Sequence, residues 1–266
     1  DRASTLLTMA THFRSAFSAL RKDVDLKARA EGINRIIDVH NNMDIDPDTL
    51  FRAVTLTDQY LQASIVDQRT MQLLSAAALY VAASHIEIES PEWRHWFFAV
   101  ITRNGAIPEA AILRMEKEIL AVVSRSLALQ GPLQTLRFDC RDVEATREEE
   151  FAARYILELC LVDYVMASVS PSAQAAAAVY CALQLSGRPK NCPKREAPYY
   201  SCSRKEFLRP LVQRMAGLFL DAPGVRNFAP YKKYKSERYH SVACLSEAKT
   251  WKLRLMAEGI LTFGGQ

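Results

Sequence analysis

Residues 76–83 read AAALYVAA, and residues 176–183 read AAAVYCAL, the same pattern repeated 100 residues later. A second pair of stretches keeps the same register: residues 51–61 read FRAVTLTDQYL, and residues 151–161 read FAARYILELCL. Phe, Ala and the final Leu occupy matching places in this second pair. Because both pairs share one offset, we interpret the chain as a duplication of one structural unit that is too long for a solenoid repeat.

Apolar residues recur at helical spacing along almost the whole chain. Only 9 of the 266 residues are glycine, and alanine, leucine, arginine and glutamate are abundant, which favours helices over turn-rich β structure. Residues 69–86 are apolar on nearly all sides, a pattern that predicts a helix buried at the centre of its unit. Small alanine side chains in such a helix let its neighbours approach closely.

The predicted fold is all-α, with two tandem five-helix domains and an extra N-terminal helix. The predicted ranges are 1–25 for the N-terminal helix, 26–130 for the first domain, 131–235 for the second domain and 236–266 for a C-terminal tail. Asp46 and Pro47 predict a helix start, with the aspartate as N-cap and the proline at the first helical position. Residues 207–220 predict a late helix with Pro210 in its first turn, where proline is tolerated.

Charge and cysteine usage limit the class of protein. The net charge is only +4 and the chain has no apolar run of about 18 residues, so we predict neither a nucleic-acid partner nor a membrane partner. The cysteines lack paired spacing, and several fall in apolar helical stretches, which indicates reduced thiols in an intracellular protein. The six are Cys140, Cys160, Cys181, Cys192, Cys202 and Cys244.

No catalytic motif is present, so we predict a protein that is not an enzyme and that holds no cofactor and no metal. The nine glycines are dispersed and the five histidines lack metal-ligand spacing. Cys192, Cys202 and His240 are a conceivable metal site, but we favour their interpretation as loop and core residues. The basic run at residues 231–235, YKKYK, fits either an RNA-binding surface or a solvated helix end, and we favour the helix end.

Several runs resemble motifs of the cyclin family. Residues 49–61, TLFRAVTLTDQYL, are similar to the cyclin pattern TLxxAVxxxDRFL. Residues 71–77, MQLLSAA, resemble LQLVGxAA, and residues 114–116 match RME. Residues 231–242, YKKYKSERYHSV, look like the REKYxxSKYHxVS that ends the A- and B-type mitotic cyclins. The resemblance covers nearly the whole chain and points to the mitotic branch.

The resemblance implies that each five-helix domain is a cyclin box. It further implies a regulatory subunit that binds and activates a cyclin-dependent serine/threonine protein kinase in cell-cycle control, in the nucleus and cytoplasm. Substrates or inhibitors of the kinase are implied as further partners. The alternative is a cyclin-fold adaptor that acts in transcription by binding DNA or peptides.

In the family, a lysine near the end of the third helix and a glutamate in the fifth helix hold the kinase. The glutamate position matches Glu116, whereas the lysine position falls on His85. A neutral imidazole supplies one hydrogen-bond donor where an ammonium group supplies three, and its charge depends on pH. The kinase-binding residues implied are His85, Ile86, Glu87, Glu116 and Leu120.

The family's substrate-docking patch is built on the motif MRAIL, with a tryptophan one turn later and a glutamine from the third helix. The corresponding residues here are Ala28, Arg29, Glu31, Gly32, Arg35 and Gln72. Most of the apolar side chains of the motif are absent, so we expect the groove that holds a substrate's leucine to be missing or rebuilt. The spacing of Glu31 and Arg35 predicts a surface ion pair instead.

Overall fold

The computed structural model describes residues 21, 23–86, 91–101, 107–123, 131–188 and 202–260, with His85, Ile86, Pro91 and residues 202–207 described by their backbone alone. Within these residues every regular element is a helix and no strand forms. Contacts divide the chain into two compact units, one within residues 19–131 and the other within residues 132–266. The predicted all-α fold with two tandem units is confirmed. The predicted extra N-terminal helix falls on residues 1–20, outside the described residues.

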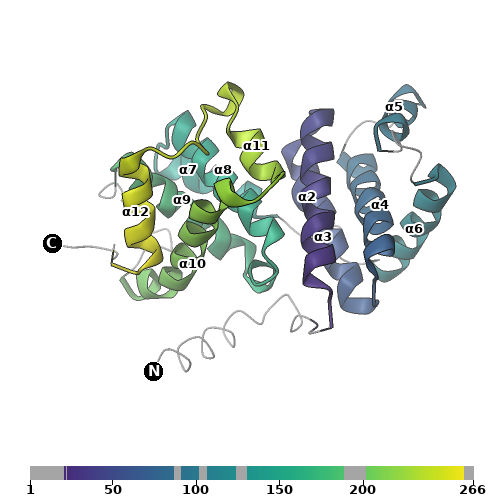
Figure 1. Ribbon diagram of the computed structural model, residues 1–266, viewed down its shortest axis with the longest axis horizontal. Coiled ribbons are helices and arrows are strands. Elements are labelled where there is room, and N and C mark those ends of the chain that lie inside the picture. Colours follow the sequence, from purple (N-terminus) through teal and green to yellow (C-terminus); the bar gives the residue numbers. More distant parts are fainter. Residues whose placement is uncertain are drawn as a thin grey trace. The chain divides into compact units, whose positions relative to one another are not determined.

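The first unit is organised around a central helix, α4. Its described helices are α2 (Leu26–Met43), α3 (Pro47–Ala63), α4 (Gln68–Ile86), α5 (Pro91–Ile101) and α6 (Glu109–Val123). Helix α4 contacts α2, α3 and α6 (Figure 1). Ala77, Ala78 and Ala82 of α4 have no exposed surface, because small side chains allow three helices to close around one axis. The prediction of a buried alanine-rich centre is confirmed for this unit.

Side chains at the helix ends fix where the helices of the first unit begin. The carboxylate of Asp25 accepts hydrogen bonds from the backbone N–H groups of Lys27 and Ala28 at the start of α2. The carboxylate of Asp46 caps α3, which has Pro47 at its first position, as the sequence predicts. These caps satisfy N–H groups that have no partner within the helix.

The second unit repeats this plan around α9. Its described elements are α7 (Pro132–Asp142), α8 (Arg147–Val162), α9 (Pro171–Ser186), α10 (Cys202–Asp221), α11 (Ala229–Tyr234) and α12 (Glu247–Ala257), with short 3₁₀ turns η1 (Met166–Ser168), η2 (Ala222–Gly224) and η3 (Glu237–Tyr239). Helix α9 contacts α7, α8, α10 and α12. Its alanines 175–178 have no exposed surface. None of the described helices is long and apolar enough to cross a membrane.

The helix that carries Pro210 is longer than predicted. Helix α10 begins at Cys202, so Pro210 lies inside the helix and not in its first turn. Proline removes one backbone donor, but Val212, Met215 and Phe219 are buried, and this packing offsets the loss. After α10, helix α12 packs against α10 and α9 and buries Leu253 and Met256.

Gly32 marks the closest approach of α2 to α4. A Cβ atom built on Gly32 would lie 2.5 Å from Oγ of Ser75 and 2.7 Å from Cε of Met71. Both neighbours are buried in α4, and Oγ of Ser75 donates a hydrogen bond to the Met71 carbonyl at 2.8 Å. Glycine is therefore required here by space rather than by backbone conformation.

We expect Gly32→Ala to lower the free energy of unfolding. The added methyl group overpacks the α2–α4 contact, which costs about 1–3 kcal/mol and exceeds the gain in helix propensity of about 1 kcal/mol. Gly217→Ala in α10 is the matched control, because a Cβ at Gly217 meets no atom within 4 Å. Urea unfolding of the three proteins measures the difference. Equal stability of the two variants would contradict the tight α2–α4 contact.

A buried carboxylate lies on the packed side of α7. Asp139 is 4% exposed, and its Oδ2 has no hydrogen-bond partner among the described residues. Burial, with a smaller contribution from Asp142, raises the pKa of Asp139 to about 6. The folded protein therefore binds this proton more tightly than the unfolded chain does, and the second unit becomes less stable as pH rises through this range.

Asp139→Asn should stabilise the protein at pH 7, by at most about 3 kcal/mol, because the amide is not ionised. The gain should shrink as pH falls from about 6 towards 4 and vanish where the natural carboxyl is protonated in both states. Thermal unfolding at a series of pH values measures this. A gain that does not change with pH would show that ionisation of Asp139 is not its cause.

Candidate functional site

Helix α6 carries two of the predicted kinase-binding residues, one turn apart. Glu116 and Leu120 are half-buried, next to the buried stripe of Ile112, Met115 and Ile119. That stripe packs α6 on α4 and α3. An apolar side chain on a firmly packed helix suits the core of a protein interface, and a carboxylate beside it can fix the register of a basic partner.

Helix α6 is also held by a hydrogen bond to α3. The Tyr60 hydroxyl donates to Oε2 of Glu118 at 3.0 Å. Burial and the neighbouring carboxylate raise the pKa of Tyr60, so the phenol remains a donor at neutral pH. Tyr60 stands where the cyclin pattern has phenylalanine, which has no hydroxyl to donate this bond.

Two of the remaining predicted kinase-binding residues, His85 and Ile86, lie at the end of α4. Helix α4 ends at Ile86, and the backbone of His85 and Ile86 completes its last turn. Glu87 falls outside the described residues, as do the side chains of His85 and Ile86. Because α4 packs against α6, four of the five predicted positions, all except Glu87, lie on two contacting helices. The proximity of His85 to Glu116 remains a prediction.

The predicted docking-patch residues separate into a buried and an exposed group along α2 and α4. Ala28 and Gly32 are buried, Arg35 is half-buried, and Glu31 and Gln72 are exposed. Glu31 does not pair with Arg35 as predicted; its Oε2 accepts a hydrogen bond from the side-chain amide of Gln68 at 3.1 Å. The surface between these two helices is therefore polar.

Arg29, the remaining docking-patch residue, is not at the surface. It is 1% exposed, and its guanidinium forms two hydrogen bonds with the Asp58 carboxylate of α3: Nε to Oδ1 at 2.7 Å and Nη2 to Oδ2 at 2.8 Å. Asp58 is itself only 7% exposed. A buried guanidinium in this geometry joins α2 to α3 and is not available to a docked peptide.

Arg29→Ala should destabilise the protein by about 3–5 kcal/mol, because it leaves the Asp58 carboxylate buried without its cation. Arg29→Lys should recover only part of this loss, since an ammonium group cannot reproduce the planar two-bond contact. Chemical unfolding tests both variants against Arg35→Ala, whose effect should stay below about 1 kcal/mol. Similar losses in the free energy of unfolding for Arg29→Ala and Arg35→Ala would contradict a large contribution from the buried ion pair.

A second buried ion pair lies in the second unit, where the sequence predicted a solvated helix end. Lys233 of the YKKYK run is 3% exposed, and its Nζ lies 2.6 Å from Oε1 of Glu158, which is 1% exposed. The hydroxyl of the fully buried Tyr234 donates to the same oxygen at 2.8 Å. The prediction of a solvated side chain was wrong for Lys233. Its partner Glu158 lies 75 residues earlier in the chain, so no local sequence pattern indicates the ion pair.

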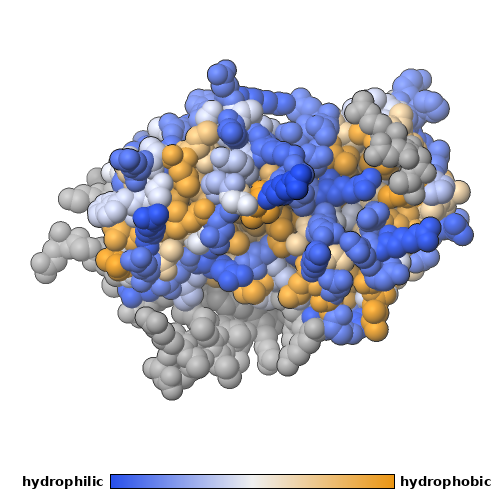
Figure 2. Space-filling view, in the orientation of Figure 1, coloured by the Kyte–Doolittle hydropathy of each residue, from blue (hydrophilic) through white to orange (hydrophobic). Residues whose placement is uncertain are grey.

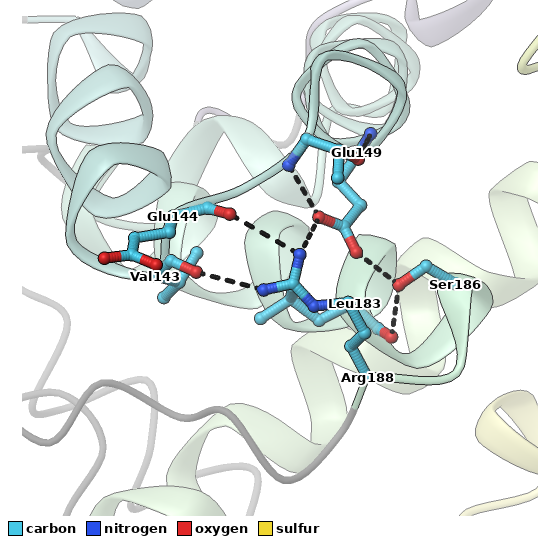
Figure 3. A network of polar contacts seen from close by, with 7 residues as sticks. Val143, Glu144, Glu149, Leu183, Ser186 and Arg188 are labelled. Atoms are coloured by element: carbon cyan, nitrogen blue, oxygen red, sulfur yellow. Dashed lines mark hydrogen bonds and ion pairs between the residues drawn. The ribbon is translucent and has the colours of Figure 1, made fainter.

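A third polar cluster links the start of α8 to the end of α9 (Figure 3). Oε1 of Glu149 accepts from the Ser186 hydroxyl at 2.5 Å, and Oε2 accepts from Nη1 of Arg188 at 3.1 Å and from the Thr146 backbone N–H at 2.8 Å. Burial opposes ionisation of Glu149, but these partners outweigh it, so its pKa lies below its usual value. The spacing of Thr146 and Glu149 is that of a capping box, so the sequence could have identified this pair, but not Ser186 and Arg188.

Metal-binding groups and cysteines are two further kinds of candidate site. No group of three or more histidine, cysteine, aspartate or glutamate side chains among them could hold a metal ion. Cys140, Cys160 and Cys181 are buried and unpaired with one another, and burial raises the pKa of the Cys140 thiol to about 12. Cys192 and the Cys202 side chain, which the sequence grouped with His240, lie outside the described residues.

Comparison with known proteins assigns both units to one family. Residues 4–128 match the family described as Cyclin, N-terminal domain, and residues 133–248 match Cyclin, C-terminal domain. A viral cyclin from herpesvirus saimiri, known from its X-ray structure, superposes with a TM-score of 0.55 at 12% identity. The match covers 97% of this chain and 95% of that chain. At this identity the superposition concerns the fold alone.

Curated relatives carry the names of mitotic cyclins. The G2/mitotic-specific cyclin-B2 of Oryzias latipes is 31% identical over 90% of this chain and 61% of its own length. Cyclin-A2-3 of Arabidopsis thaliana is 31% identical over 86% of this chain and 52% of its length. The G2/mitotic-specific cyclin cdc13 of Schizosaccharomyces pombe is 30% identical over 82% of this chain and 44% of its length. The chain thus spans less than two thirds of the length of these relatives.

Proposed function

The chain belongs to the cyclin family, and we propose that it binds a cyclin-dependent serine/threonine protein kinase and activates it in cell-cycle control. The observation that supports this proposal is the packing of α4 against α6, since the sequence resemblance assigns the kinase contact to residues of these two helices. Mitotic names among the relatives support the cell-cycle branch over an adaptor that acts in transcription. The cellular location proposed is the nucleus and cytoplasm.

Activation would work by population shift. A rigid helical surface that contacts the active arrangement of the kinase better than the inactive one shifts the kinase toward the active form. The chain would contribute no catalytic group of its own, because the kinase supplies its own catalytic residues. Helix α6 suits this role because its buried stripe and the hydrogen bond from Tyr60 to Glu118 fix its position.

Glu116 would accept hydrogen bonds from backbone N–H groups or a basic side chain of the kinase. His85 would occupy the position at which the family has lysine, and it would contribute a donor whose charge depends on pH. Leu120, Ile86 and Glu87 would complete the contact. Substrate or inhibitor peptides that rely on an apolar leucine pocket would find a polar surface between α2 and α4, so we propose that they do not dock there.

Glu116→Ala should weaken kinase binding by one decade or more, because truncating one charged partner of a desolvated interface pair costs about 2–5 kcal/mol. His85→Lys restores the family residue and should maintain or strengthen binding. Titration calorimetry with a panel of purified cell-cycle kinases gives the affinities, and a histone-kinase assay gives the activation.

Lys117→Ala is the control for this experiment, since Lys117 is the exposed neighbour of Glu116 on the same helix. Its affinity should equal that of the natural protein. If Glu116→Ala binds as tightly as Lys117→Ala while both remain folded, the contact lies elsewhere on the molecule. Absence of binding to every kinase in the panel would argue against the function as a whole.

A further inference from the structure

A short basic segment follows α10 in the second unit. We define it as residues 226–238, which contain Arg226, Lys232, Lys235 and Arg238 at exposed positions. Glu237 is the one acidic residue within this segment. Hydrophilic residues cover the surface over α11, the helix in the middle of the segment (Figures 1 and 2). Aromatic and basic residues alternate in this run, and the proposed kinase contact does not include it.

One lysine of the segment forms a buried ion pair, whereas other basic residues of the segment are exposed. Lys233 is neutralised by Glu158 inside the unit. Arg226, Lys232 and Lys235, in contrast, have no carboxylate within ion-pair distance among the described residues. The Lys235 ammonium lies 5.9 Å from the centre of the Tyr231 ring. A ring restrains an ammonium group without neutralising it, so the positive charge remains available to a ligand.

The tyrosine rings in the segment and directly after it are buried or approached by cations. Tyr234 has no exposed surface, and the Tyr239 ring is approached by both the Arg238 guanidinium at 5.6 Å and the Lys233 ammonium at 5.7 Å. The Tyr231 ring lies under Lys235. Binding of single-stranded nucleic acid relies on bases stacked on open aromatic faces. The tyrosines therefore do not form a row of open rings, whereas the cations are exposed, which favours a ligand recognised by its negative charge.

We infer that the basic segment docks an acidic peptide, a stretch of a partner protein with several closely spaced aspartate or glutamate residues. Lys232 and Lys235 are three residues apart along a helical backbone, so their side chains start from the same face, with Cβ atoms about 5–6 Å apart. Alternate carboxylates of an extended peptide also share one face, about 6–7 Å apart. One such peptide can reach both ammonium groups, and Arg226 extends the positive field around them.

A fluorescent peptide in which glutamate alternates with serine tests this inference by anisotropy, with a glutamine-for-glutamate peptide as the uncharged probe. We expect the glutamate peptide to bind and the glutamine peptide not to bind. Affinity should fall steeply when the Debye length is reduced from about 30 Å to about 8 Å by added salt. The double variant Lys232→Gln/Lys235→Gln should lose about tenfold in affinity.

The matched control is Lys117→Gln/Arg254→Gln, which removes the same charge from exposed positions on α6 and α12. It should bind the glutamate peptide within about twofold of the natural protein, because the removed charges lie outside the basic segment. Circular dichroism shows whether both double variants fold, and the salt dependence of the natural protein gives an independent readout if one does not.

Three outcomes would overturn the inference. The first is no binding of the glutamate peptide at low salt. The second is an equal loss of affinity in both double variants, which would show that binding depends on the net charge of the protein and not on the basic segment. The third is tighter binding of a single-stranded RNA or of vesicles with anionic lipids, lost in the Lys232/Lys235 variant, which would assign the segment to a different ligand. No kinase is present in this experiment, so its result is independent of the proposed kinase binding.

Discussion

Neighbouring helices can approach only as closely as the side chains between them allow, and in both units an alanine-rich helix sets this limit. Helix α4 buries Ala77, Ala78 and Ala82 completely, and α9 does the same with alanines 175–178. A helix with a narrow side-chain layer can be surrounded by three or four others at close distance. The position of α6, and with it that of Glu116 and Leu120, follows from this packing because α6 rests directly on α4.

Much of this architecture could be predicted because it depends on local sequence. The alanine runs, the cap formed by Asp46 with Pro47 and the capping-box spacing of Thr146 with Glu149 are each readable within a few residues. The positions of Glu116 and Leu120 on one helix follow from the same periodicity. Burial of charge is different, because it depends on a partner that the fold brings from elsewhere. Nothing in the local sequence distinguishes the buried Lys233 from its exposed neighbour Lys232. Only the fold brings Glu158 next to Lys233.

The surface between α2 and α4 shows how one small residue changes what a site can hold. A leucine pocket needs two helices far enough apart to leave apolar walls exposed. Gly32 removes the side chain that would separate them, and Met71 and Ser75 of α4 occupy the space where its Cβ would be. The residues left at the surface, Glu31, Gln68 and Gln72, are polar. The polar surface residues and the close approach of the two helices at Gly32 therefore both disfavour a leucine pocket.

The two buried ion pairs are better explained by orientation than by stability. Removing charges from water costs about as much as their attraction returns, so such pairs add little net stability compared with apolar residues of similar shape. Each pair here joins different helices: Arg29 and Asp58 join α2 to α3, and Lys233 and Glu158 join α11 to α8. A helix that slid or rotated would leave a charge buried without its partner, which is costly. An apolar contact would tolerate the same movement at smaller cost. For a protein proposed to act by presenting a rigid surface to a kinase, a unique helix arrangement matters more than additional stability.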